Sequence, residues 1–363
     1  MRSREACLAG RVAVAVVGSC LLAGPARAQA TRIDSETFGG LEARSIGPAA
    51  MSGRVAAVDG AAGDRLTIYV GTAGGGLWKS VDGGLKFKPI FDKYNQSIGA
   101  VTVDPADPKT VWVGTGETWV RNSVSVGDGI YRSTDAGDTW TKVGLADSER
   151  IARILVSPKD SHTVFACATG HLFDDSAERG VFRTKDAGKT WEKVLYVAPD
   201  TGCADLAMDP QDPNILYAGM WQFRRRPDFF TSGGPKSGFY RSADGGVTWQ
   251  PVKKGLPPGD LGRIAIAVAP SKPSVVYAAV ESARTALFRS EDRGQTWTEV
   301  NSSSAVTVRP FYFARLVADP NNPDRLYKMG TTIAISEDGG KTFSPLGGAS
   351  VTGSSYHSDV HDL

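Results

Sequence analysis

The sequence has almost no net charge, few cysteines and no long apolar run in its main part. Its 41 basic and 39 acidic side chains nearly cancel, which leaves a formal net charge of +2. A nucleic-acid binder would show a basic stripe and a strongly positive total, so this balance argues against that class. No stretch after residue 30 is apolar enough to cross a bilayer. The G-x-S-x-G elbow is missing, and no Ser, His and Asp set carries the flanking strings of a peptidase.

The first segment has the layout of a secretory signal peptide. Arginines precede an apolar run, which ends in small residues at Ala26 and Ala28. We therefore predict a signal peptide over residues 1–28 and export to the periplasm or the extracellular space. Cys20 leaves lipoprotein anchoring as the less favoured alternative.

Two of the four cysteines remain after the predicted cleavage, Cys167 and Cys203. An exported chain meets an oxidising environment, where these two could form a disulfide. Two buried thiols are the alternative, because free cysteine is commonly buried in protein cores. The sequence gives no geometry with which to choose between them.

Glycine and proline are abundant, with 42 and 20 residues, as expected for short strands separated by turns. No segment shows a sustained helical period. One ten-residue phrase recurs six times, most clearly as YRSTDAGDTW from Tyr131. Its central aspartates lie roughly fifty residues apart, the length of a four-stranded propeller blade. They are Asp82, Asp135, Asp186, Asp244, Asp292 and Asp338.

Each position of the phrase has a role in a hairpin turn. An aspartate side chain can accept backbone N–H bonds inside its own turn, and the glycine two residues later adopts a backbone angle that side chains resist. The aromatic residue at the end, such as Trp140, starts the next strand and can bury a large ring against a neighbouring blade. The six aspartates are therefore expected to be structural and not catalytic.

The phrase matches the Asp-box, or BNR, repeat of sialidase-like and sortilin-like propellers. Strings such as RSIGPAAMSGRV from Arg44 and GMWQFRRRP from Gly219 also resemble large exported bacterial proteins. These proteins carry a sortilin N-terminal-like propeller, and many are labelled "glycosyl hydrolase, BNR repeat". The resemblance implies an all-β propeller of about six four-stranded Asp-box blades plus the start of a seventh.

The expected domain organisation follows from this resemblance. A lead-in over residues 29–44 comes before a propeller over residues 45–363, whose last string, SSYHSDVHDL, begins like the inner strand of a seventh blade. Relatives of this type run on beyond that point, so we expect an N-terminal fragment. A partner or a missing C-terminal region would then complete the propeller.

The variable loops between the second and third strands of each blade are the default ligand site of a propeller. Arginine beside aromatic rings could hold carboxylates or stack on sugars and peptide side chains. Ordinary loop packing is the alternative. The candidates are Glu117, Trp119, Arg121, Asn122, His171, Arg179, Trp221, Arg224, Arg225, Phe229, Phe230 and Arg309.

A weak metal candidate lies in the last string. His357, Asp359 and His361 alternate, so in a strand all three would point to one face. Two imidazoles and a carboxylate suit a divalent cation, but nothing fixes a fourth ligand. We expect no metal and no cofactor.

Among enzymes, xyloglucanase-type glycoside hydrolases are the nearest resemblance, being Asp-box propellers with two catalytic aspartates. Their first aspartate sits in a string like Y-A-R-T-D-I-G-G-A-Y. Laid over YVGTAGGGLW, that position is Ala73. The second normally lies in another propeller, and the Arg-Ile-Pro string of sialidases is absent.

We therefore predict a non-catalytic module that binds a protein, peptide or glycan on its loop face. A glycoside hydrolase fragment and an assembly-factor scaffold are the alternatives. Fold similarity alone does not decide among them.

Overall fold

The computed structural model describes residues 54–61, 63–346 and 359–363, all within one unit that spans Ile46–Leu363. The predicted signal peptide, the lead-in and His357 lie outside the described residues.

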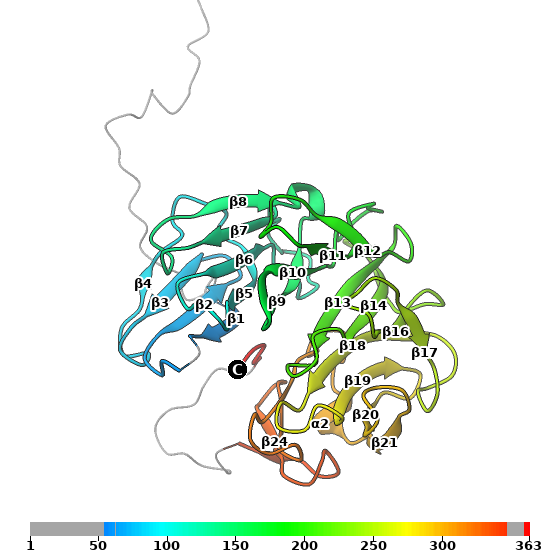
Figure 1. The fold of residues 1–363 in the computed structure, drawn as a ribbon. Coiled ribbons are helices and arrows are strands. Elements are labelled where there is room, and N and C mark those ends of the chain that lie inside the picture. The colour runs from blue at the N-terminus through cyan, green and yellow to red at the C-terminus, as the bar shows by residue number, and fades with distance from the viewer. Residues whose placement is uncertain (1–53, 62, 347–358) are drawn as a thin grey trace, which may run out of the picture. The chain divides into compact units, whose positions relative to one another are not determined.

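The described chain forms six antiparallel sheets, in which consecutive strands are neighbours (Figure 1). We call these sheets blades one to six in chain order. Blade one contains β1 (Val55–Gly60), β2 (Ile68–Thr72), β3 (Leu77–Ser80) and β4 (Lys88–Pro89). Blade two contains β5 (Ile98–Val103), β6 (Val111–Thr115), β7 (Ile130–Ser133) and β8 (Thr141–Gly144). Blade three contains β9 (Ile151–Ser157), β10 (Asp160–Ala168), β11 (Gly180–Thr184) and β12 (Glu192–Leu195).

Blade four has a fifth strand, which pairs with the end of its long second strand. It contains β13 (Thr201–Met208), β14 (Leu216–Arg225), β15 (Phe230–Ser232), β16 (Gly238–Ser242) and β17 (Gln250–Val252). Blade five contains β18 (Leu261–Val268), β19 (Val276–Ser282), β20 (Ala286–Ser290) and β21 (Thr298–Asn301). Blade six contains β22 (Leu316–Ala318), β23 (Leu326–Lys328), β24 (Ala334–Ser336) and β25 (Ser344–Pro345). The helices are η2 (Ala146–Ser148) and α2 (Ser304–Thr307).

The expected all-β propeller of six four-stranded blades is confirmed. The seventh blade is not present as a sheet among the described residues, because residues 359–363 belong to none of the six sheets. Within the described part, no helix has the length and apolar character needed to span a membrane.

Apolar layers between consecutive blades form the core. The layer between blades one and two, for example, combines Tyr69 and Phe91 with Val111, Tyr131 and Trp140. Phe91 meets both Tyr131 and Trp140 edge-on, with ring centroids 5.1 Å apart. Such aromatic contacts add to the free energy gained by burying apolar area. Trp140, the aromatic residue of the blade-two phrase, therefore packs against the preceding blade, as expected.

Cys167 on β10 and Cys203 on β13 form a disulfide between blades three and four. Both side chains are fully buried. The disulfide alternative is therefore the one that the structure contains.

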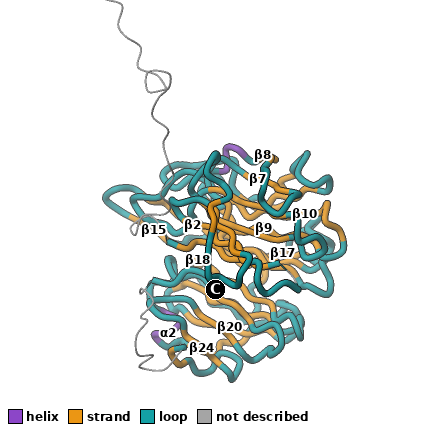
Figure 2. Tube along the Cα trace, turned by 90° about the vertical axis from the view of Figure 1, so that its left-hand side faces the viewer, coloured by secondary structure: helices purple, strands orange, loops and turns teal. Residues whose placement is uncertain are grey.

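Antiparallel connection of the strands divides the turns between two faces of the propeller. The Asp-box turns join the third and fourth strands, and the proline turns join the first and second, so both kinds lie on one face, here called the box face. The loops between second and third strands, and those between successive blades, lie on the opposite face, here called the loop face. Figure 2 shows β15, the extra strand on the loop face, at the edge of the described body.

Candidate functional site

On the box face, each aspartate is occupied by its own turn. Asp135 accepts hydrogen bonds from the Ser133 hydroxyl at 2.7 Å, the Thr139 N–H at 2.8 Å and the Thr139 hydroxyl at 2.5 Å. These bonds to the charged form lower the pKa of Asp135 to about 2. The same contacts recur at Asp186, Asp244, Asp292 and Asp338, while Asp82 has only the serine and backbone donors.

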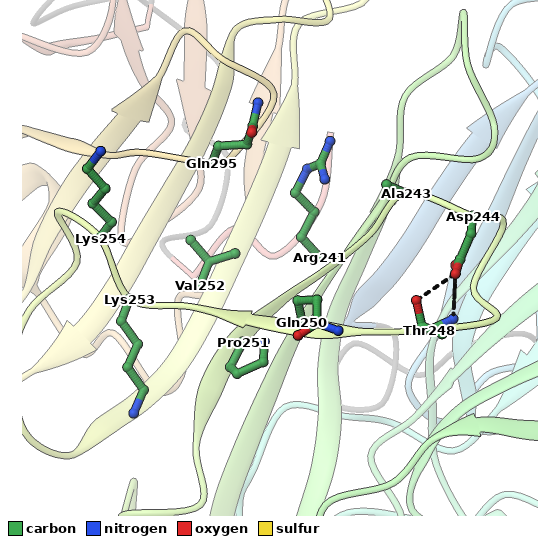
Figure 3. A pocket seen from close by; sticks show the side chains of 10 residues that line it. All are labelled: Arg241, Ala243, Asp244, Thr248, Gln250, Pro251, Val252, Lys253, Lys254 and Gln295. Carbon is green, nitrogen blue, oxygen red and sulfur yellow. Dashed lines mark hydrogen bonds between the residues drawn. The ribbon is translucent and has the colours of Figure 1, made fainter.

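A hollow of about 390 Å³ lies beside the Asp-box turn of blade four (Figure 3). Lys253 and Lys254 line it together with Arg241 and Gln295, and Asp244 faces Thr248 at one side. The Arg241 Nε atom already donates to the Arg293 carbonyl at 2.7 Å. The hollow lies at the boundary between two blades. Its acidic residue, Asp244, is already bound by Thr248.

On the loop face, several predicted ligand residues are buried and hold the loops together. The exposed fraction is 4% for Trp119, 0% for Trp221 and 0% for Arg179. Arg263, which we did not predict, lies between Trp119 and Trp221, with its guanidinium carbon 4.7 and 4.9 Å from the two rings. Burial lowers the pKa of Arg263 to about 10. These predicted ligand residues are thus buried supports of the loops in this structure, and their contact with a ligand stays a prediction.

Glu117 is also buried, with 1% of its side chain exposed, and pairs with Arg54 through contacts of 2.6 and 2.8 Å. Burial raises the pKa of Glu117, and the Arg54 guanidinium partly offsets this. Arg54 was not predicted. A carboxylate held in this way supports the loop and is closed to a substrate on the surface.

Arg179 supports the blade-three loop from beneath. Its Nη2 atom donates to the carbonyls of His171 at 2.6 Å and Asp174 at 3.1 Å, and its guanidinium lies 4.4 Å from the Phe223 ring centre. His171 in turn contacts the Asp174 carboxylate at 2.9 Å and the Asp147 carbonyl at 3.1 Å. Both predicted residues are therefore engaged within the protein.

A patch that is partly or fully exposed remains where the loops of blades two, three and four meet. We call it the loop-face patch, and it consists of Asn122, Phe173, Arg224, Arg225, Arg226 and Phe229. Phe173 is 45% exposed and Phe229 is 43% exposed, which is high for phenylalanine.

Contacts between the loops fix this patch. The Arg225 Nε atom donates to the Asn122 side-chain oxygen at 2.7 Å, and Arg224 pairs with Asp175 while donating to the Phe173 carbonyl at 3.2 Å. Arg225 and Arg226 lie over the rings of Phe230 and Phe229, at 5.5 and 5.4 Å.

The other two predicted arginines lie near Tyr312. The interaction with Tyr312 raises the pKa of Arg121, and burial partly offsets this rise. Arg309 places its guanidinium carbon 5.0 Å from the Tyr312 ring centre. Arg309 is exposed, and so could meet a ligand.

The proposed metal set does not assemble in the described part of the chain, where no cluster of three His, Cys, Asp or Glu side chains is found. His361 is 3% exposed and stacks on Trp119, with ring centroids 4.7 Å apart. Asp359 has a φ of 86°, so the expected regular alternation does not hold. Burial and the neighbouring arginines lower the pKa of His361 to about 3.

Ala73 follows β2 and donates its N–H to the Arg54 carbonyl at 2.9 Å. It is 3% exposed. Ala73, which the sequence overlay sets against the first catalytic aspartate of xyloglucanase-type enzymes, is therefore a small buried side chain.

Comparison with known proteins agrees with the repeats. The family model described as "Sortilin, neurotensin receptor 3" matches residues 128–233, and the BNR-Asp box repeat model matches residues 287–300. A xyloglucanase of Paenibacillus sp. is 24% identical over 78% of this chain and 30% of its own length. A xyloglucanase of Hypocrea jecorina is 27% identical over 53% of this chain and 25% of its own length, and Xgh74A of Acetivibrio thermocellus is 25% identical over 78% and 37%. The chain thus spans about a third of the length of these glycoside hydrolases.

Solved structures share the fold. An ancestral GH74 enzyme has a TM-score of 0.60 at 17% identity, covering 84% of this chain and 39% of its own. The GH74 xyloglucanase from Xanthomonas campestris has a TM-score of 0.52 at 17% identity, covering 83% and 54%. YCF48 bound to D1 peptide has a TM-score of 0.53 at 17% identity, covering 85% and 87%. The chain therefore folds as a β-propeller of six Asp-box blades, and it is similar to the sortilin model over residues 128–233 and to xyloglucanases over part of their length.

Proposed function

We propose that this propeller is part of a xyloglucanase-like glycoside hydrolase and that its loop-face patch binds a polysaccharide chain. The observation that carries the proposal is the exposure of Phe173 and Phe229 beside three arginines, on loops from adjacent blades. Aromatic rings offer flat apolar faces for sugar rings, and guanidinium groups donate hydrogen bonds to their oxygens. The xyloglucanases similar to this chain support a glycan over other ligands.

The part played by this chain is binding, and cleavage depends on carboxylates that the loop-face patch does not supply. Ala73 offers no acid, Glu117 is buried against Arg54, and Asp175 is paired with Arg224. Glycoside hydrolysis by the usual routes needs two carboxyl groups on either side of the scissile bond. Export directed by residues 1–28 is part of the proposal, because polysaccharides of this kind lie outside the cell.

The test combines binding and turnover on xyloglucan, with a β-glucan lacking side chains as a second ligand. We expect retardation of the protein in xyloglucan-containing gels and no release of reducing ends. Phe229→Ala and Arg225→Ala should each weaken binding about tenfold, the effect of losing about 1.4 kcal/mol. Lys189→Ala, in the Asp-box turn of blade three on the box face, is the matched control and should leave binding unchanged. Steady release of reducing ends by this chain alone would show that a catalytic pair is present after all.

A peptide or protein ligand is the second candidate, which would suit an assembly-factor scaffold. Three consecutive arginines on the blade-four hairpin favour a carboxylate-bearing partner, and the likeness to YCF48 covers most of both chains. Binding to an acidic peptide that weakens steeply with salt, without binding to xyloglucan, would favour this candidate.

A further inference from the structure

The second residue of the Asp-box phrase is basic in blades one to five, and in four of these blades it bonds to a turn of the following blade. The bonds join Lys79 to the Ala136 carbonyl, Arg183 to the Gly245 carbonyl, Arg241 to the Arg293 carbonyl and Arg289 to the Asp324 carboxylate, at distances between 2.5 and 2.8 Å. Each of these cations therefore ties one blade to the next.

Arg132, the corresponding residue of blade two, is the exception. Within the described ranges it bonds to nothing in blade three, and its buried Nε atom has no hydrogen-bond partner. Its cross-strand neighbour on β6 is Trp112, whereas the other four blades have tyrosine or phenylalanine at that place. The Arg132 guanidinium carbon lies 5.4 Å from the Trp112 ring centre, and the Trp112 Nε1 atom is also buried without a partner among the described residues. Two buried donors are thus unpaired at the boundary between blades two and three.

A hollow of about 520 Å³ lies on the box face beside Arg132, between β8 and the Asp-box turn of blade three. Thr141 of β8 is the next cross-strand neighbour of Arg132, so Trp112, Arg132 and Thr141 form one row across the blade. Thr134 and Trp191 also line the hollow. None of the described residues that line it is acidic.

The corresponding hollows at two other boundaries contain acidic side chains. The hollow beside Arg241 includes Asp244 (Figure 3), and the hollow beside Arg289 includes Glu291 and Glu337 among its acidic residues. In both hollows the arginine is already bonded to the following blade. The hollow between blades two and three differs on both counts, because its arginine is not bonded to that blade and no described carboxylate lines it. It therefore attracts a negatively charged group.

The lining side chains indicate which kind of anion fits. An arginine holds a carboxylate through two parallel N–H···O bonds, because its planar fork matches the carboxylate geometry. The side chains of Thr134 and Thr141 are exposed, and their hydroxyls can donate to or accept from the hydroxyl groups of a ligand. Trp191 is partly exposed and adds an apolar wall. The volume falls within the roughly 300–1,000 Å³ of small-molecule sites. These features suit an organic acid better than an inorganic anion or a protein surface.

We propose that this hollow binds a small organic carboxylate, whose carboxylate group is held by the Arg132 guanidinium. The threonine hydroxyls favour a sugar acid over an aliphatic acid, because they can bond to the hydroxyl groups of a sugar ring. The site lies on the box face, so it does not depend on the polysaccharide binding proposed for the loop-face patch.

The test titrates the whole chain calorimetrically with glucuronate, the methyl ester of glucuronate and succinate. Glucuronate should bind saturably and the ester at least tenfold more weakly, because esterification removes the charge that Arg132 recognises. Arg132→Gln should weaken glucuronate binding at least tenfold, with little change in the midpoint of chemical denaturation. Arg241→Gln makes the same change at the corresponding place in blade four, and it is the matched control that should leave glucuronate binding unchanged. Both variants should leave xyloglucan binding unchanged, so that this proposal and the proposed function fail separately.

A second variant decides if Arg132→Gln does not fold. Thr141→Asp places a carboxylate directly beside Arg132 at an exposed position of β8, where it should compete with the ligand and weaken glucuronate binding at least tenfold. Gln250→Asp does the same beside Arg241 and should have no effect on glucuronate binding.

The other outcomes are equally distinct. Glucuronate binding that is absent, or unchanged by Arg132→Gln and Thr141→Asp, would overturn the site. Equal affinity for inorganic phosphate would mean a general anion site, and binding of a hexaglutamate peptide without binding of either acid would assign the hollow to a protein partner, so both results contradict the proposal. Tighter binding of succinate than of glucuronate would support the site and assign it to an aliphatic acid.

Discussion

The box face and the loop face contain many of the same residue types, yet they use them in opposite ways. On the box face, carboxylates accept hydrogen bonds from hydroxyls and N–H groups of their own turns, and the pKa values fall to about 2. On the loop face, Asp175 and Glu117 instead pair with arginines from other loops. The box face repeats the same hydrogen bonds within each turn, whereas the contacts on the loop face join residues of several blades.

This difference separates structural from functional candidates. An aspartate that repeats in every blade and is bound by its own turn is a part of the scaffold and not a candidate for a ligand that only one site binds. The exposed residues Phe229 and Arg226 lie on a hairpin that, among the six described blades, blade four alone possesses. Repetition therefore marks scaffold here, and departure from the repeat marks the candidate site.

The largest effect that would test this comparison is expected on the box face. Trp297→Ala removes a buried ring that meets Phe239 edge-on, with centroids 4.9 Å apart, and should lower the free energy of unfolding by about 3–5 kcal/mol. Phe87→Ala is the matched control, because Phe87 holds the same position of the phrase but is 39% exposed and should cost much less. Chemical denaturation measures both. Equal losses would show that the packing of the box aromatics does not govern stability.

Acid should reduce the stability contributed by His361 and by the box-face aspartates at different pH values. The pKa of His361 falls to about 3 because of burial and the nearby Arg263, Arg54, Arg121 and Arg315, so the unfolded chain binds more protons than the folded chain between pH 6.5 and 3. Stability from this side chain is full above pH 6.5 and is lost as the pH falls, by at most about 2 kcal/mol at pH 5. The box aspartates, with pKa values near 2, keep their contribution until the pH drops below 3.8.

Comparing His361→Phe with the parent chain isolates this effect. Asp59 acts in the opposite direction, because burial raises its pKa to about 6, so that the stability it contributes is present below pH 3.8 and lost as the pH rises through 6. The difference between parent and His361→Phe removes that common background. Between pH 7 and 4, the free energy of unfolding should fall less steeply with falling pH for the variant than for the parent chain. An equal dependence on pH in the parent and the variant would mean that His361 is not buried as a neutral side chain.

A smaller effect is expected from a single box carboxylate. Asp292→Asn weakens the bonds to Thr296 and Ser290 and should lower the free energy of unfolding by about 1 kcal/mol, with no change in ligand binding. Asp138→Asn, at an exposed carboxylate on the same face that is not the central aspartate of its turn, is the control for the loss of charge. Loss of xyloglucan binding in Asp292→Asn, with stability intact, would give the box face a functional role.

Much of the fold could be predicted because its signals are local. The Asp-box turn is made by contacts within a few residues, such as Ser133 to Asp135 and Asp135 to Thr139, so each copy can be recognised in the sequence by itself. The candidate site was predicted less well. Trp119 and Trp221 were expected at the surface, but Arg263 from blade five lies between them and buries both. Arg54, Arg153 and Arg315 were missed for the same reason, since their acidic partners lie far away in sequence.

By itself, the sequence determined the repeat, the all-β class, the six blades and the structural role of the six aspartates, because these depend on short-range hydrogen bonds and a regular spacing. Only the tertiary structure decided that Cys167 and Cys203 pair, which loop residues are buried, and that Arg315 pairs with Asp362. These outcomes depend on contacts between blades, and the distance between two side chains on different blades is set by the packing of every sheet between them.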